Sequence, residues 1–181
     1  MRAMESTPAR PTLDVVRWLC AYQGWSGAHI LDVAAKLDES QARQPGMIAG
    51  GHRDGSLFET LAHLNSAAEI WLSRWEGNQR ATFRDSSDFA DMVSLYRNWH
   101  AVERRLAGLL RLLTQAHLDG LLHYFTTAGV PQALPLGQTI IHATIHSTHH
   151  RAEAAVALTA LGSPPPRMDL LEFMRANAPG A

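Results

Sequence analysis

Four long stretches of this sequence carry apolar residues at the spacing of an α-helix. They span residues 13–37, 56–76, 88–114 and 136–161. In each stretch large apolar side chains recur every three or four positions, which places them on one side of a helix and predicts that this side is buried. Because such helices bury their apolar sides against one another, the sequence predicts an all-α fold, a four-helix bundle with one long crossover connection.

Residues that favour helix ends mark the boundaries of these stretches. Thr12 and Asp88 are expected to cap the first and third helices, and Ser56 with Glu59 predicts a capping box at the start of the second. Gly77 is expected to end the second helix. The fourth is expected to stop at a glycine followed by three prolines, GSPPP.

The connections between the helices are of two kinds. Residues 38–55 carry four glycines and many polar groups, which is typical of a loop, and a histidine in this loop, His52, is expected to be solvated. Residues 117–135 contain the aromatic and β-branched run HYFTT and the turn signal AGVP, so we expect a short hairpin or an extended crossover there. After the fourth helix, residues 168–175 predict a short C-terminal helix that packs on the bundle through Leu170, Leu171 and Phe173.

Length and composition predict one globular domain over residues 1–181, with residues 1–11 as a loose lead-in. The chain has 181 residues, of which 46% are hydrophobic and 18% are charged. The net charge is −1 and the 16 basic residues form no run, which argues against a nucleic-acid-binding surface. We find no signal-peptide-like apolar segment and no stretch that would span a membrane, so a cytoplasmic protein is expected.

The single cysteine, Cys20, excludes an internal disulfide and fits a reducing compartment. It lies within the apolar pattern of the first helix. A small buried hydrophobic side chain is therefore a better interpretation of Cys20 than a nucleophile.

Residues 142–153, HATIHSTHHRAE, hold four of the ten histidines of the chain. At about 100° per residue, His146 and His150 lie one turn apart on the same face of the helix, and His142 and Glu153 lie within roughly 40° of that face. Two imidazoles with this spacing can bind one metal ion, but a third ligand must come from elsewhere. The spacing alone leaves open whether these histidines bind a metal or are packed side chains held by hydrogen bonds.

Two motifs resemble the DinB family, a group of metal-binding four-helix bundles that includes YfiT-like proteins. They are TLAHLNSAAEIWL in the second helix and HATIHSTHHRAEAAVALTALGSPPPRMDLLEFMR in the fourth helix and beyond. The resemblance implies that His63, His146 and His150 are the three metal ligands. Periodicity alone gave no role to His63, which lies on the flank of the second apolar stripe. The chain departs from the family pattern at Ile145 and at Ala152–Glu153, so the resemblance does not carry over a particular substrate contact.

The resemblance also implies partners and chemistry. The expected cofactor is a divalent transition metal, zinc or nickel, and family members include S-transferases and isomerases that use low-molecular-weight thiols. A small-molecule substrate and a homodimer are expected on the same ground. Glu153 is a candidate catalytic residue that orients a ligand or acts as a base, although a solvated helix glutamate is an equally good interpretation. Arg151, which points away from the ligand face, is expected to be a structural ion-pair partner.

Three functions fit these observations. The first is a metal-dependent enzyme, a low-molecular-weight-thiol S-transferase or a hydrolase, with the 38–55 and 117–135 connections shaping an open pocket beside the histidines. The second is a non-catalytic metal-binding bundle, a sensor or interaction module, which a closed site with His142 or His149 as a fourth ligand would favour. The third is a structural bundle whose histidines are packing residues.

Overall fold

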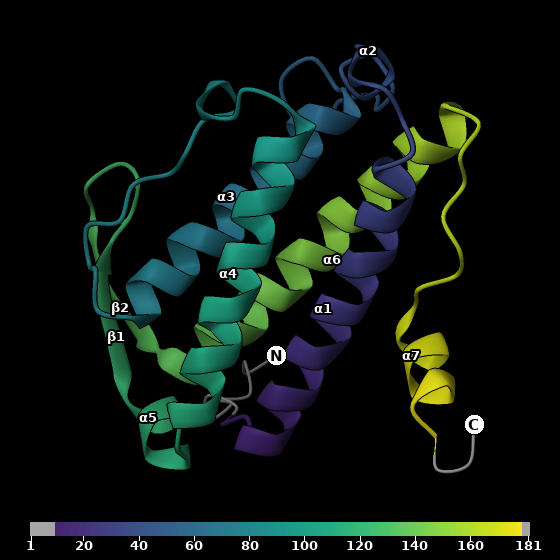
Figure 1. The fold of residues 1–181 in the computed structure, drawn as a ribbon. Helices are drawn as coiled ribbons and strands as arrows, with labels where there is room; N and C mark the ends of the chain where they lie inside the picture. The colour runs from purple at the N-terminus through teal and green to yellow at the C-terminus, as the bar shows by residue number, and fades with distance from the viewer. Residues whose placement is uncertain (1–9, 179–181) are drawn as a thin grey trace, which may run out of the picture.

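The computed structural model describes residues 10–178, and four long helices dominate it (Figure 1). They are α1 (Leu13–Ala34), α3 (Leu57–Trp75), α4 (Met92–Leu112) and α6 (Leu136–Ala160). Helix α6 packs mainly on α3 and α1, and α4 packs mainly on α3. The predicted four-helix bundle is therefore confirmed, with α3 and α6 as its most extensively packed pair of helices.

Short elements complete the fold. The predicted hairpin is present as β1 (Leu121–Phe125) and β2 (Pro131–Pro135), which pair antiparallel. The C-terminal helix is α7 (Leu170–Ala176). Three elements were not predicted, because each is too short to show an apolar period: α2 (Glu39–Ala42), the 3-10 turn η1 (Ser86–Asp88) and α5 (Gln115–Asp119).

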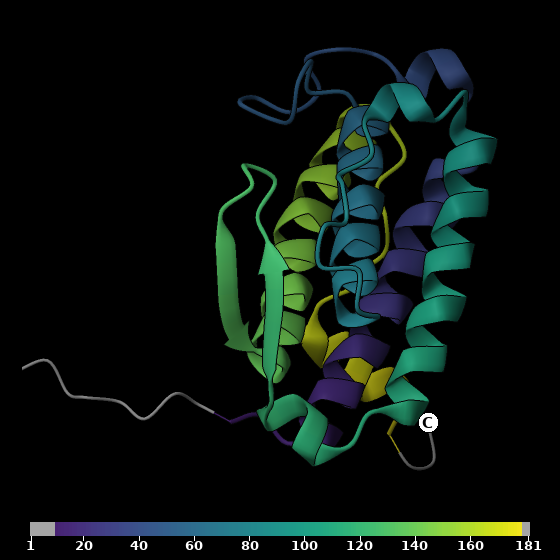
Figure 2. The ribbon, with the colours of Figure 1, turned by 90° about the vertical axis from the view of Figure 1, so that its left-hand side faces the viewer.

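The hairpin lies beside α3 and α6 (Figure 2). Arg74 of α3 connects it to the bundle, because its guanidinium donates to the carbonyl oxygen of Phe125 at 3.1 Å and lies over the rings of Trp71 and Tyr124. Helices α3 and α6 are joined nearby by Trp75, whose Nε1 donates to Oγ1 of Thr139 at 3.0 Å. These contacts fix the hairpin along one side of the α3–α6 pair.

The helix caps partly follow the prediction. Thr12 caps α1 as expected, and the Ser56 side chain accepts a hydrogen bond from the Glu59 backbone, but the Glu59 carboxylate completes no capping box. It instead accepts from the Ser86 hydroxyl at 2.8 Å. The assignment of Asp88 as the cap of the third long helix was wrong, because Asp91 caps α4 with a complete box and Asp88 belongs to η1.

Two glycines end helices as predicted. Gly77 and Gly162 have φ values of 101° and 77°, in the left-handed region that side chains other than glycine rarely adopt. Each follows directly after the last turn of α3 or α6, so the chain can reverse there without strain.

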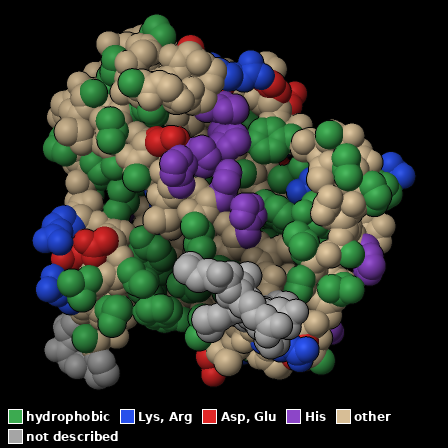
Figure 3. Space-filling model, turned by 180° about the vertical axis from the view of Figure 1, so that it is seen from behind, with side chains coloured by type: hydrophobic (Ala, Val, Ile, Leu, Met, Phe, Trp, Pro, Cys, Tyr) green, Lys and Arg blue, Asp and Glu red, His purple; other side chains and the backbone are tan. Residues whose placement is uncertain are grey.

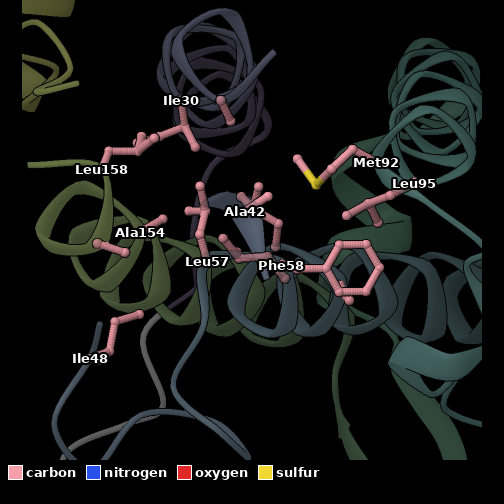
Figure 4. Close-up of a cluster of buried hydrophobic side chains, with 14 of the residues drawn as sticks. Ile30, Ala42, Ile48, Leu57, Phe58, Met92, Leu95, Ala154 and Leu158 are labelled. Atoms are coloured by element: carbon pink, nitrogen blue, oxygen red, sulfur yellow. The ribbon is translucent and has the colours of Figure 1, made fainter. Parts of the chain in front are cut away.

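The largest hydrophobic cluster lies at one end of the bundle and draws on all four long helices (Figure 4). Ile30, Phe58, Leu95 and Leu158 contribute one fully buried side chain each from α1, α3, α4 and α6. Residues from α2 and the following loop join them, among them Ala42 and Ile48. A second cluster contains Val16, Cys20, Leu113, Leu118 and Ile140. Cys20 is thus buried as expected, and burial raises the pKa of its thiol to about 11, which keeps it protonated.

Helix α7 packs on α1 through one aromatic side chain. Phe173 is buried, and its ring centroid lies 5.6–6.3 Å from those of Trp18, Tyr22 and Trp25. The expectation that Leu171 also packs inward was wrong: it is 49% exposed, because the helix is too short to bury more than one face. Of the expected lead-in, residues 1–9 lie outside the described part of the chain. Among described residues, no helix is long and apolar enough to cross a membrane.

Candidate metal centre

Three histidines from two helices converge on one point. His63 comes from α3, and His146 and His150 come from successive turns of α6. One ring nitrogen of each lies within 4.8 Å of the other two. Imidazole nitrogens bound to one zinc ion at about 2.0–2.1 Å would be roughly 3.3 Å apart, so small side-chain rotations bring this group into ligating geometry.

The packing of α6 explains why its histidines lie where they do. Ala143, Ser147, Arg151 and Ala154 form the buried side of the helix, while the preceding positions of each turn lie on its flank. His146 and His150 are consequently half-buried at the edge of the α3–α6 contact. In the space-filling view a group of histidine side chains gathers in a patch on a hollowed face of the molecule, and other histidines lie apart from it (Figure 3).

The surroundings of the cluster favour neutral imidazoles. Burial is the main cause that lowers the pKa of His63 and of His146 from the ordinary 6.5 to about 4. The charge that the neighbouring histidines would carry adds to this effect, since like charges disfavour one another. Both side chains are therefore unprotonated at pH 7, which is the state that binds a metal.

His63 also lacks the partners that a packing histidine would have. Its Nδ1 is buried and has no hydrogen-bond partner among the described residues. Buried polar atoms in folded proteins are nearly always satisfied, so each exception needs an explanation. His63 is therefore poorly described as a packed side chain held by hydrogen bonds. A role as a metal ligand explains why its ring lies beside those of His146 and His150.

Glu153 contacts the cluster from the next turn of α6. One carboxylate oxygen, Oε2, lies 2.6 Å from Nδ1 of His150, and the other, Oε1, lies 3.2 Å from Nε2 of His149. Its side chain is 23% exposed. Glu153 is thus held by two imidazoles rather than freely solvated, and a catalytic role for it stays a prediction.

The two histidines considered as a fourth ligand do not join the group. His142 is exposed and its ring packs against Trp71, with centroids 5.4 Å apart. The side chain of His149 is 70% exposed. Within residues 10–178, the group that includes His63 therefore consists of three histidines, although His149, His150 and Glu153 also lie close enough together to hold a cation.

Sequence reasoning missed two side chains that flank His63. The ring centroid of His52 lies 4.3 Å from that of His63, and the ring centroid of Phe83 lies 5.4 Å from that of His63. His52 is half-buried, so the expectation that it is a solvated loop histidine was wrong. Both residues lie in connections without a regular period, and no signal in the sequence placed them next to α3.

Two cavities adjoin the histidines. One of about 400 Å³ is lined by His63, His52, Arg53 and Phe83, and one of about 300 Å³ is lined by His142, Tyr124 and Leu134. The 38–55 connection contributes to the first and the 117–135 connection to the second, as expected from the sequence. The first cavity therefore gives the three-histidine cluster space for a small molecule beside His63, and the second lies beside His142.

Comparison with known families agrees with this geometry. The sequence model of the DinB family matches residues 12–181, nearly the whole chain. The chain belongs to the DinB family. A search among curated proteins gives no match at the level of an individual relative. DinB membership and the three-histidine cluster together support a possible metal site in this chain, while the identity of the metal is a separate question.

Proposed function

We propose that this DinB-family chain is a metal-dependent enzyme in which His63, His146 and His150 hold one divalent ion. The observation that carries the proposal is the convergence of three imidazoles, two of them with a pKa of about 4, beside a cavity that His63 lines. Zinc and nickel both suit three imidazole ligands. A low-molecular-weight-thiol S-transferase is the reaction that we favour, with hydrolysis as its close variant.

The ligand set supports a catalytic site over a structural one. Structural zinc sites use four protein ligands, whereas catalytic sites use three and leave a position open. A divalent ion bound by three neutral imidazoles would supply positive charge that lowers the pKa of a thiol or a water at that position. Neither His142 nor His149 closes the site, which fits the catalytic alternative.

Glu153 is the residue that we assign to orientation. Its carboxylate accepts from Nδ1 of His150 at 2.6 Å, which fixes the tautomer and leaves Nε2 of that ring as the ligand nitrogen. The same carboxylate is also our candidate base, which would accept the proton of a thiol or a water bound beside the three histidines. Phe83 and Trp71 give each of the two cavities an apolar wall against which a small organic substrate can pack.

A screen of thiols against the metal-loaded protein tests this proposal. We expect at least one low-molecular-weight thiol, tested among glutathione, cysteine, bacillithiol and mycothiol, to bind the zinc- or nickel-loaded protein in calorimetry and to be consumed with an electrophilic substrate. Binding should be absent from His146→Ala. Stoichiometric metal without binding of any of these thiols and without hydrolase activity would instead favour a non-catalytic metal-binding bundle.

A further inference from the structure

A third cavity lies on the other side of α3 and α6 from the histidine cluster. It has a volume of about 280 Å³ and lies between these two helices, α1 and α4. Ser147 and Arg151, which line it, directly follow His146 and His150 in the sequence and so point about 100° away from them around α6. Exposed Ala21 of α1 and Ala107 of α4 lie at its edge, so it opens to solvent between those helices.

Two glycines of α1 explain how the cavity forms. A Cβ atom added at Gly27 would lie 3.4 Å from Cζ2 of Trp99, so the Trp99 ring of α4 packs against α1 there. A Cβ atom added at Gly24, one turn earlier, would meet nothing within 4 Å. Gly24 therefore borders open space, and a side chain at this position would enter the cavity that Gly24 lines.

Most of the cavity wall is apolar. Its aliphatic and aromatic surface comes mainly from α3 and α4: Leu64, Ala68, Trp99, Val102, Leu106 and Leu110. Arg17 of α1 also lines the cavity, and its guanidinium donates to the carbonyl oxygens of Leu110 and Leu113. Glu103 also lines the cavity, but its carboxylate is engaged by Nε1 of Trp99 and by Nδ1 of His100, each at 3.1 Å. The volume is near the lower end of the range of small-molecule pockets, about 300–1,000 Å³.

A buried cation lies at the inner end of this apolar wall. Arg151 is 4% exposed, and no carboxylate of the described residues lies within 4.0 Å of its guanidinium. Its known contacts are neutral: it donates to Oγ1 of Thr148 at 2.8 Å and lies over the ring of Tyr22 at 5.3 Å. Among residues 10–178, Arg151 is therefore not the ion-pair partner that the sequence led us to expect. Buried charges are normally paired, because an unpaired one loses its hydration without compensation.

Two further buried donors line the same cavity. Asn65 is 1% exposed, and its Oδ1 accepts from Nδ2 of Asn98 at 2.6 Å, while its own Nδ2 has no acceptor among the described residues. The hydroxyl of Ser147, which is 4% exposed, likewise has no hydrogen-bond partner in the described part of the chain. The amide and the hydroxyl are donors that a carboxylate can use together with a guanidinium.

From this arrangement we propose that the cavity binds a small amphipathic monocarboxylate. The carboxylate accepts hydrogen bonds from Arg151, Asn65 and Ser147, and the apolar body of the ligand lies along the α3 and α4 side chains. This site is separate from the proposed metal centre and does not depend on its function. Octanoate is a suitable probe, because it combines one carboxylate with a short apolar chain.

Titration of octanoate into the full-length protein, measured by calorimetry, tests the proposal. We expect one octanoate per chain, and the same result for His146→Ala, which removes a proposed metal ligand. Gly24→Phe should abolish binding, because its ring fills the cavity, while Gly24→Ala is the matched control and should bind like the wild type. Arg151→Met should weaken octanoate binding by about tenfold or more, the usual effect of losing a charged hydrogen bond, while binding of uncharged octanol stays the same.

Three results would overturn the proposal. One is the absence of octanoate binding to the folded wild-type protein at millimolar ligand, and another is equal binding by Gly24→Phe, which would place octanoate elsewhere. The third is an equal loss of octanoate and octanol binding in Arg151→Met, which would show that Arg151 does not bind the carboxylate of the ligand. If Arg151→Met does not fold, Ser147→Ala serves the same comparison, because removing one hydroxyl leaves the core volume nearly unchanged.

Discussion

Oε2 of Glu153 lies 2.6 Å from Nδ1 of His150, one turn along the same helix. A carboxylate in this position holds an imidazole in one tautomer and one orientation, with the opposite nitrogen free to bind a metal. Sequence spacing placed the two residues near each other, but only the packed structure shows that the carboxylate is turned toward the histidine cluster.

Replacement of Glu153 tests this orienting role. We expect Glu153→Gln to keep metal bound, because its amide oxygen can still accept from Nδ1 of His150, but with affinity or catalytic rate lowered by about 10-fold to 100-fold. Competition with a chelator gives the affinity, and turnover in the thiol assay gives the rate. A variant that matches the wild type in both would leave Glu153 without a role in the site.

The pKa values of His63 and His146 predict how the metal-free protein responds to acid. Both are lowered from 6.5 to about 4, so between these pH values the unfolded chain binds more protons than the folded one. Their contribution to stability is complete above pH 6.5 and is lost as the pH falls toward 4. Urea unfolding in the presence of a chelator should therefore give a free energy of unfolding that declines from pH 7 to pH 5.

His146→Gln is the control for that experiment, because glutamine has similar size and does not titrate. We expect a shallower decline than in the wild type, since one of the two shifted groups is gone. An identical pH dependence in both proteins would show that His146 does not carry the depressed pKa assigned to it here.

Metal removal should lower stability without unfolding the protein. The hydrophobic clusters around Phe58 and Ile140 do not include the histidines, so the fold does not rest on the metal. A ligand at 100 times its dissociation constant stabilises the folded state by about 2.7 kcal/mol. Thermal unfolding followed by circular dichroism should show a melting temperature that rises with free zinc, and a metal-free protein without a cooperative transition would refute this expectation.

Replacement by alanine should change the stability of the protein differently at the two glycines of α1, Gly24 and Gly27. Gly24→Ala should stabilise the protein by up to about 1 kcal/mol, because alanine favours the helix and its methyl group meets no neighbour. Gly27→Ala should raise the free energy of unfolding by less, since its methyl group would lie 3.4 Å from Cζ2 of the partly buried Trp99. Chemical denaturation of the two variants side by side measures the difference, and an equal gain at both positions would mean that α1 and α4 are not in close contact at Gly27.

The regular parts of this structure were predictable from the sequence, and the irregular parts were not. A helical period fixes which residues share a face, so the bundle and the pairing of His146 with His150 followed from spacing alone. His63 could be assigned only by resemblance to the DinB family, because which face of α3 meets α6 depends on tertiary packing. His52 and Phe83 lie in connections whose path no local pattern specifies. The sequence offers two aspartates near the start of α4, Asp88 and Asp91, and the structure shows that Asp91 is the cap.

The environment of Arg151 was also beyond sequence reasoning. Its position away from the ligand face was correctly deduced from the helical angle. That no carboxylate of residues 10–178 pairs with it depends on what α1, α3 and α4 place opposite it. The same holds for the cavity itself, which Gly24 of α1 lines together with residues of α3, α4 and α6.

The central claim, that three histidines form one metal site, is tested most directly by the metal content of the purified protein. After incubation with zinc or nickel and removal of the excess, elemental analysis should give about one equivalent per chain for the wild type. His142→Ala should retain that equivalent, whereas His63→Ala and His146→Ala should lose it. A folded wild-type protein that retains neither zinc nor nickel, or a His63→Ala variant that retains as much as the wild type, would contradict the account.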